Sequence, residues 1–596
     1  MLTETPTTEI EEGNGSQPGP AADDQNGANL PIRRRKGAWL SRVSQRVARY
    51  LFQLRYGILV WCIGARSPHA DLSRKGIVIV QVDALGHHNL QEALARGYMP
   101  YLKRLAQDPS FKLGRWRVGI PCDTPPVQSA LMYGENEDVV GFYWMEKETG
   151  RRVSCANPFS VREVEDEMAG KDWHSIFAKG STYGSIFAGK AFRSVMTVNA
   201  LHPETIGKRL GIRHLLLFAL LNPLKTLAIF GNAAWDVILE LTDRLIVILL
   251  NRRRRREGFM TLSRIFLNVI FREATSIGTR IDMYLGTPVI YAVFLGYDLV
   301  AHHSGPLSPN SLRTLKGIDG CLRKIDRVRS WCERDYDLYV LSDHGMTPSI
   351  PFGQAYGKTL TRYVTEIADS ASIDPNEDPA EYHSDNLFSF LKDLRQYEPQ
   401  VSPPLVPILR LVGTMMKRWL KVSDQSQQAK VIAVGCSPLA HVYLREPKRR
   451  LNLSEVEELC PELLPALRYH EGIGLVIGKE GDDVVILSKK GQLILGRERI
   501  IIGEYPLTGV EEPELAEEQI NRYARMNKCG DLILFGAMHG DDVICFENQL
   551  GSHGTLGGDQ YYAFMLYPSS ADLRLDEVTE ARGLHLFFRR LVNQVD

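Results

Sequence analysis

Short apolar runs in this 596-residue chain end next to residue types that bind metal ions. Five such runs cover residues 76–82, 289–295, 337–342, 531–536 and 542–547. Their β-branched residues are typical of strands, and helical stretches over 90–105 and 312–328 lie between some of them. This alternation predicts an α/β domain with a largely parallel sheet, and polar side chains at the carboxyl ends of its strands should gather at one edge.

The candidate ligands form a set of three carboxylates and three imidazoles. They are Asp83, Asp298, His302, Asp343, His344 and His553. A single aspartate after a strand is more often a turn or capping residue, so the hypothesis rests on the whole set. Six mixed N/O ligands suit two divalent cations, an arrangement that stabilises both the attacking and the leaving oxygen of a phosphoryl transfer.

A nucleophile for such a site is found in the segment IPCDTPPVQSALMYG, residues 120–134. Thr124 stands there on a proline-rich turn before a helix-like stretch, where backbone amides at the start of the helix could meet an anion. Ser129 is the nearest competing hydroxyl, but it falls inside the predicted helix. Thr124 is therefore the candidate nucleophile, against the alternative that it only caps the helix.

The order of these motifs resembles the alkaline phosphatase superfamily, and within it the type I phosphodiesterase and nucleotide pyrophosphatase-like branch. The motifs are an aspartate after the first strand, Thr-Pro-Pro before a helix, D-x-x-x-H-x-x-G-P, D-H-G and a late S-H-G. The resemblance covers residues 76–132, 289–346 and 530–568. It implies an α/β alkaline-phosphatase-like sandwich, with a central largely parallel sheet flanked by helices and with helical and small β-rich cap insertions.

The resemblance also implies how the ligands divide. It assigns Asp298, His302 and His553 to one metal, and Asp83, Asp343 and His344 to the other. Thr124 would contact the second metal and form a covalent phospho-threonine. The cofactors would be two divalent ions, Zn²⁺ or else Mn²⁺. The expected activity is a phosphodiesterase or pyrophosphatase, with a phosphomonoesterase or a catalytically silent membrane-surface scaffold as alternatives.

The chain departs from the patterns of this superfamily at two places that bear on the expected class of substrate. Nucleotide pyrophosphatases often carry an asparagine three residues after the threonine to bind a phosphoryl oxygen, but Val127 stands there in this chain. Gln128 follows it and is the predicted substitute in substrate binding. The formylglycine pattern of sulfatases is also broken, because Cys122 is followed by Thr124 and Pro126 where that pattern needs proline and arginine.

Composition divides the chain into three parts. Residues 1–32 are polar and read as a disordered tail, and residues 33–70 read as a basic amphipathic helical segment. Residues 71–596 would then form the catalytic domain. Long spacings between its motifs indicate a hydrophobic and basic helical insertion at about 200–275 and a cap at about 400–528.

Charge and cysteine content bear on partners and location. Lys plus Arg equal Asp plus Glu at 71 each, so no nucleic-acid-binding module is evident. Nine scattered cysteines without a CxxC motif favour reduced thiols. Apolar stretches next to 33–36 and 252–256, both basic, suit peripheral contact with an anionic membrane, or else packing on the catalytic domain. Without a signal peptide or a run of ~18 apolar residues, we expect a cytoplasmic protein. If the basic apolar stretches contact the membrane, the protein would be peripheral on its inner face. The oligomeric state stays open.

Overall fold

The computed structural model describes residues 46–58, 60–61, 72–171, 174–202, 231, 266–368 and 430–595. The chain divides into two units, residues 1–57 and 58–596. The predicted tail at 1–32, the basic residues at 252–256, and most of the predicted insertion at 200–275 lie outside the described residues.

The described part of the first unit is a helix that starts at residue 46, within the predicted amphipathic segment. Its apolar side chains Val47, Tyr50 and Leu51 are more than half exposed. Phe52 and Tyr56 are buried, and their ring centroids lie 4.4 Å apart. Among the described residues, no helix is both long and apolar enough to cross a bilayer.

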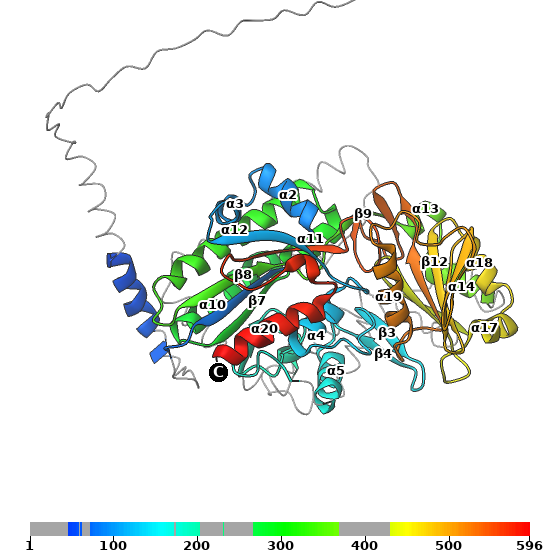
Figure 1. Ribbon diagram of the computed structural model, residues 1–596, viewed down its shortest axis with the longest axis horizontal. Helices are drawn as coiled ribbons and strands as arrows, with labels where there is room; N and C mark the ends of the chain where they lie inside the picture. The colour runs from blue at the N-terminus through cyan, green and yellow to red at the C-terminus, as the bar shows by residue number, and fades with distance from the viewer. Residues whose placement is uncertain are drawn as a thin grey trace, which may run out of the picture. The chain divides into compact units, whose positions relative to one another are not determined.

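The second unit contains a central seven-stranded sheet in the order β2-β20-β8-β1-β7-β5-β6 (Figure 1). Five neighbouring strands run parallel, β8, β1, β7, β5 and β6, and β20 pairs antiparallel with β8 and β2. The bounds are β1 Gly76–Val82, β2 Phe111–Arg117, β5 Ser181–Tyr183, β6 Arg193–Val195, β7 Val289–Phe294, β8 Tyr336–Leu341 and β20 Tyr562–Pro568.

Helices cover both faces of this sheet. They are α2 His87–Ala95, α3 Pro100–Ala106, α4 Thr124–Tyr133, α5 Pro158–Gly170, α10 Arg272–Tyr284, α11 Gly296–Ser304, α12 Pro309–Arg329 and α20 Ala581–Val595. On one face, α4 and α20 share a core with alternate residues of the strands, such as Ile79 and Tyr291. The opposite face is covered by α10 and α12, which pack together, and α10 packs on β7.

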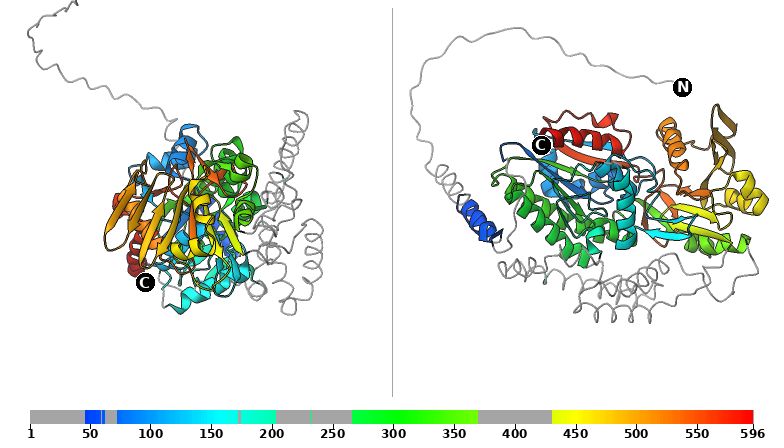
Figure 2. Two further views of the ribbon diagram at one scale, coloured as in Figure 1. Left: turned by 90° about the vertical axis from the view of Figure 1, so that its right-hand side faces the viewer. Right: turned by 90° about the horizontal axis from the view of Figure 1, so that it is seen from below.

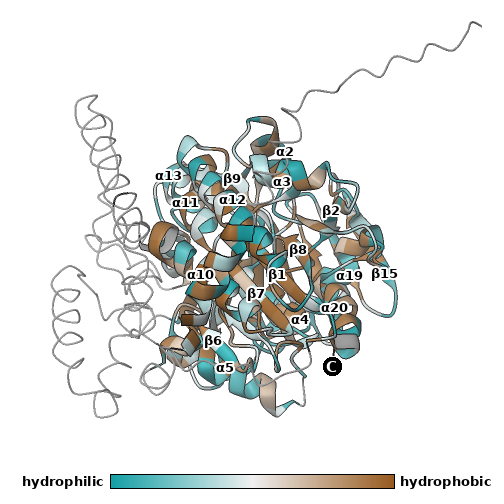
Figure 3. Cartoon of the chain, turned by 90° about the vertical axis from the view of Figure 1, so that its left-hand side faces the viewer, coloured by the Kyte–Doolittle hydropathy of each residue, from teal (hydrophilic) through white to brown (hydrophobic). Residues whose placement is uncertain are grey.

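Burial on both faces explains the sequence of the strands. Every residue of β1 and of β7 is buried, as the continuous apolar runs predicted, and these strands form a hydrophobic band in the centre of Figure 3. The predicted helix over 90–105 is broken into α2 and α3, because Gly97 adopts a positive φ of 76° and Pro100 starts the second helix.

A second seven-stranded sheet forms the cap, in the order β10-β11-β16-β12-β13-β14-β15 (Figure 2). Its pairings are all antiparallel. The bounds are β10 Val431–Cys436, β11 Leu439–Leu444, β12 Ile473–Glu480, β13 Asp483–Leu487, β14 Gly491–Leu495, β15 Arg499–Gly503 and β16 Leu532–Gly536. The strand expected at 531–536 is therefore present as β16, but it belongs to the cap sheet and not to the central sheet.

Helices pack on both faces of the cap sheet. They are α14 Leu360–Ala368, α17 Leu453–Leu459, α18 Leu463–Tyr469 and α19 Pro513–Ala524. On one face, α14 packs on β10, and α17 and α18 pack on β12. On the other face, α19 shares a core with alternate residues of β12 to β14, including Ile520 of the helix and Leu493 of β14.

Two smaller sheets complete the described fold. One is four-stranded, in the order β17-β18-β9-β19, with β9 Thr347–Pro351, β17 Met538–His539, β18 Asp542–Cys545 and β19 Gly551–Ser552. The other is the pair β3 Tyr143–Glu146 and β4 Arg151–Ser154. In the four-stranded sheet, β9 pairs with both β18 and β19, so it joins the chain before the cap to the chain after it.

Candidate metal centre

The first ligand group is built on α11 and on the segment after β19. Asp298 and His302 are four residues apart on α11, so both lie on one face of the helix. His302 Nε2 lies 3.1 Å from Asp298 Oδ1. His553 Nε2 lies 3.4 Å from the same oxygen and 3.1 Å from His302 Nε2. The three side chains can therefore offer ligand atoms to one ion.

Backbone contacts tie these two segments together. The Nδ1 atom of His302 is 2.8 Å from the carbonyl oxygen of Gly551, and the amide of Leu550 donates to the carbonyl oxygen of His302 at 2.7 Å. Because Nδ1–H donates to Gly551, the nitrogen of His302 that can bind a metal is Nε2, which faces Asp298 and His553. A hydrogen bond from the far ring nitrogen is the usual way in which a ligand histidine is oriented.

The second ligand group lies at the carboxyl ends of β1 and β8. Asp83 follows β1 directly, and Asp343 and His344 come shortly after β8, the strand beside it. His344 Nε2 lies 3.6 Å from Asp343 Oδ2 and 4.0 Å from Asp83 Oδ1. All three side chains are buried. The structure thus brings together all six predicted ligands, in the two groups of three that the resemblance implied.

The candidate nucleophile lies beside the second group. Thr124 is the first residue of α4, and its Oγ1 is 3.0 Å from His344 Nε2 and 3.4 Å from Asp83 Oδ1. The side chain is buried, with 4% of its surface exposed. The His344 and His553 rings stack with centroids 3.9 Å apart, so this hydroxyl lies near both ligand groups.

The expectation that amides at the start of α4 meet an anion is wrong for this helix. The Thr124 amide donates to Asp123 Oδ1 at 2.8 Å, and the Val127 amide donates to the Asp123 carbonyl. Pro125 and Pro126, between them, have no N–H. The first turn of α4 therefore has no free amide, and charge on a substrate must be balanced by other groups.

Unpaired polar atoms show that the ligand groups suit a cation. Asp343 Oδ2 is buried and accepts no hydrogen bond from any described residue, although its Oδ1 accepts one from the Ala84 amide at 3.2 Å. Asp298 Oδ1 is also buried without a well-aligned donor. Buried carboxylate oxygens without partners are costly, and divalent cations bound by carboxylate and imidazole would satisfy them. The donor set therefore fits two divalent metals.

The protonation of the site without metal reflects three carboxylates close together. Burial, and then the charges of Asp343 and Asp298, raise the pKa of Asp83 well above its ordinary value. Burial acts in the same direction on Asp298, but His302 and His553 outweigh it and hold its pKa well below the ordinary value.

Two histidines, one from each ligand group, respond in opposite directions. Burial lowers the pKa of His302, but Asp298 outweighs burial and raises it to about 9. Burial lowers the pKa of His344, although Asp343 opposes the effect. In the absence of metal, His302 is therefore a cation at neutral pH and His344 is neutral.

Asp123 is a site residue that the sequence did not single out. Its Oδ1 lies 3.7 Å from His553 Nδ1, and with His344 and His553 it forms a third group of potential ligands. Its Oδ2 accepts a hydrogen bond from Cys436 Sγ of β10 at 3.2 Å. The sequence signal was present, because an aspartate before Thr-Pro-Pro is a typical N-cap, but its proximity to His553 depends on the fold.

Gln128, the predicted substrate-binding residue, is fully buried on α4. Its Oε1 accepts a hydrogen bond from the Ile186 amide at 2.9 Å. Its Nε2 is buried and has no partner among the described residues. The role in substrate binding stays a prediction.

The central sheet is mostly parallel and is flanked by helices, so the predicted α/β fold class is confirmed, and the two ligand groups and the Thr124 hydroxyl lie beside one another in it. No family model matches the chain. The chain is similar to GPI ethanolamine phosphate transferase 2 of Yarrowia lipolytica, with 24% identity over 205 residues, 31% of this chain. The match spans only 22% of that relative's length.

Two solved structures are also similar. Phosphonoacetate hydrolase from Sinorhizobium meliloti has 14% identity and a TM-score of 0.41, over 88% of this chain and 96% of that chain. Murine ectonucleotide pyrophosphatase/phosphodiesterase 5 has 11% identity and a TM-score of 0.44, over 87% and 95%. The three proteins fall within the superfamily that the motif order resembles. Because the TM-scores lie below 0.5, the fold class rests on the sheet order and not on these two likenesses.

Proposed function

We propose that this chain is a two-metal phosphoric ester hydrolase, and most readily a phosphodiesterase or pyrophosphatase that works through phospho-Thr124. The observation that carries the proposal is the position of the Thr124 hydroxyl, 3.0 Å from His344 of one ligand group, whose ring stacks on His553 of the other. A buried hydroxyl between two cation sites has the arrangement of an activated nucleophile.

The ligands would divide as the geometry groups them. Asp298, His302 and His553 would hold one ion and Asp83, Asp343 and His344 the other, with Zn²⁺ or Mn²⁺ suited to the mixed N/O set. When bound, the ions supply positive charge that lowers the pKa of the threonine hydroxyl and stabilises the leaving oxygen.

The chain's own residues set the nucleophile and its approach. The Thr124 hydroxyl donates to Asp83 Oδ1 at 3.4 Å and lies 3.0 Å from His344 Nε2, so two residues that would hold the ion also position the nucleophile. The proton of the hydroxyl leaves to water as the nucleophile ionises. The bond from Thr124 oxygen to phosphorus forms as the bond to the leaving oxygen breaks, and water then cleaves the phospho-threonine to release phosphate or a monoester. Asp123 fixes the backbone of the nucleophile through the Thr124 amide.

Two other reactions use the same intermediate. A phosphomonoesterase would form phospho-Thr124 from a substrate that carries one ester group instead of two. Transfer of the phosphoryl group from Thr124 to an alcohol is favoured by the likeness to a phosphate transferase. Product analysis with and without an added alcohol separates transfer from hydrolysis, and a panel of aryl mono- and diesters separates the two esterases.

The experiment measures bound metal and turnover together. Wild-type protein loaded with Zn²⁺ or Mn²⁺ should contain two ions per chain and hydrolyse an aryl phosphodiester. Thr124→Ala should keep the metal and lose nearly all turnover, while Thr124→Ser, which keeps the hydroxyl, should retain part of it. Ser129→Ala is the control, because Ser129 Oγ contacts the Glu135 carbonyl and Met168 Sδ and no residue of the ligand groups. Metal-replete Thr124→Ala with wild-type turnover would remove Thr124 from the mechanism.

We also propose peripheral membrane contact from the cytoplasmic side. Support comes from the helix that starts at residue 46, whose exposed Val47, Tyr50 and Leu51 accompany Arg46 and Arg49. Co-sedimentation with anionic vesicles should decrease as salt rises, and Leu51→Asp should weaken it further. Absence of binding at low salt would remove this proposal and leave the hydrolase unaffected.

A further inference from the structure

The outer strand of the cap sheet is an unprotected edge. β15 ends the sheet, and among the described residues no strand pairs with its outer side. It carries three consecutive isoleucines, Ile500, Ile501 and Ile502, with 43%, 41% and 55% of their surfaces exposed. An edge strand normally carries proline, an inward lysine or a bulge that prevents pairing with another chain. β15 has none of these, and its pairing with β14 is regular.

The isoleucines cover both faces of the strand. Ile500 and Ile502 pair with Ile494 and Gln492 of β14, so they share the face on which α17 and α18 lie. Ile501 pairs with Leu493 and lies on the opposite face, where α19 packs. A strand that pairs with this edge must therefore be apolar on both faces, whereas most strands that pair with a sheet edge are apolar on one face only.

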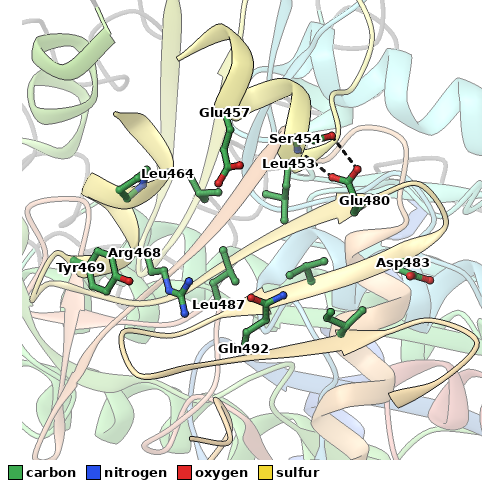
Figure 4. Close-up of a pocket in the computed structure, with 13 residues that line it drawn as sticks. Leu453, Ser454, Glu457, Leu464, Arg468, Tyr469, Glu480, Asp483, Leu487 and Gln492 are labelled. Atoms are coloured by element: carbon green, nitrogen blue, oxygen red, sulfur yellow. Dashed lines mark hydrogen bonds between the residues drawn. The ribbon is translucent and has the colours of Figure 1, made fainter. Parts of the chain in front are cut away.

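The face of Ile500 and Ile502 continues into a pocket of about 390 Å³ between the helices and the strands (Figure 4). Its lining combines apolar side chains, Leu464 of α18 and Leu487 of β13, with charged ones such as Glu457 and Arg468, and α17 and α18 lie beside it. No described helix covers β14 and β15 on this side, so the exposed apolar surface extends from the pocket to the strand edge.

We propose that β15 is a dimerisation edge that pairs antiparallel with β15 of a second copy of this chain. A two-fold axis at Ile501 places Ile501 opposite its own copy, and Ile500 opposite Ile502 of that copy, twice. Each isoleucine then meets an isoleucine on the same face, so the strand is complementary to itself. The two cap sheets would become one continuous sheet, and the apolar surfaces beside the two pockets would adjoin the axis.

The charges near the strand are compatible with this register. Arg499 is held by Glu517, with Nη2 2.6 Å from Oε1, so it does not introduce a free charge into the pair. Glu498 would face Glu504 of the second copy, but Lys490 Nζ lies 3.4 Å from Glu504 Oε2 and offsets its charge. The charges of the flanking residues therefore do not prevent association through the isoleucines.

The test is sedimentation of the full chain from about 1 to about 100 µM, a range suited to an interface of modest size. Wild-type protein should shift from monomer to dimer across this range. Ile501→Lys should remain a monomer, because the axis brings two lysines together, and Ile501→Val should dimerise. Leu459→Lys is the matched control: Leu459 is also an exposed residue of the cap, 55% exposed, but is not on the edge, so dimerisation should persist.

A covalent test keeps the proposal falsifiable if Ile501→Lys unfolds. Residues opposite one another in an antiparallel pair have Cβ atoms about 5 Å apart, so Ile501→Cys should form an intermolecular disulfide on mild oxidation. Leu459→Cys should not. A wild-type monomer at every concentration, cross-linking that is equal for both variants, or open-ended aggregates instead of a dimer would each overturn the proposal.

Discussion

Metal binding by this chain should depend steeply on pH, because one proposed ligand is protonated in the metal-free protein. Asp298 raises the pKa of His302 to about 9 against the effect of burial. Its Nδ1 already donates to the Gly551 carbonyl, so the proton that a metal must displace is the one on Nε2. At pH 7, about 1% of His302 is neutral, and the apparent affinity should be roughly a hundredfold below its limit, about 2.7 kcal/mol.

The assay is calorimetric titration of Mn²⁺ into the metal-free protein between about pH 6.5 and 8.5. The apparent Kd should fall about tenfold for each pH unit, and buffers of different ionisation enthalpy should report the release of close to one proton. His302→Ala should bind more weakly with a shallower pH dependence, whereas His539→Ala, which changes an exposed histidine of β17, should behave as the wild type. A pH-independent Kd without proton release would refute the reasoning.

Three further outcomes follow from buried polar groups. Gln128→Ala should lower the free energy of unfolding by roughly 1–3 kcal/mol in urea titrations, because the Ile186 amide loses its acceptor, and the KM for a diester tests the predicted substrate contact. Lys147→Met should cost at most roughly 3–5 kcal/mol, because the buried Asp531 carboxylate, 2.7 Å from Lys147 Nζ, loses its cationic partner and keeps only the Leu444 and Leu451 amides. In the metal-free protein, the contribution of Asp83 to thermal stability should fall as pH rises above 3.8, since the folded state holds the proton of Asp83 more tightly than the unfolded state; the difference in melting temperature between wild type and Asp83→Asn, measured with chelator across pH, tests this.

The ligands of the candidate site could be predicted because neighbouring parallel strands end at the same edge. Asp83 and Asp343 each come after an apolar run, so the predicted strand and the predicted ligand are adjacent in the sequence. The pair Asp298 and His302 was recognisable from its spacing of four residues. Proximity of these residues to His553 followed only from the motif order, since 251 residues separate His302 from His553.

Other features could not be predicted, because a local pattern does not state its partner strand. The apolar run at 531–536 would suit either the central sheet or the cap sheet. Only the pairing of β16 with β11 and β12 assigns it to the cap. The contact of Asp123 with Cys436 joins residues 313 apart. In contrast, the lack of free amides at the start of α4 could have been read from Pro125 and Pro126, which carry no N–H.

The small sheet that contains β9 has a consequence for how this chain can change over evolution. β9 begins three residues after His344, and β19 ends one residue before His553, while β9 pairs with both β18 and β19. The chain thus enters and leaves the cap beside two paired strands, β9 and β19, which lie next to the proposed ligands His344 and His553 in the sequence. Cap loops that lie away from β9, β19 and Cys436 can therefore change in length without moving His344 relative to His553, so the cap can vary while the proposed ligands keep their positions.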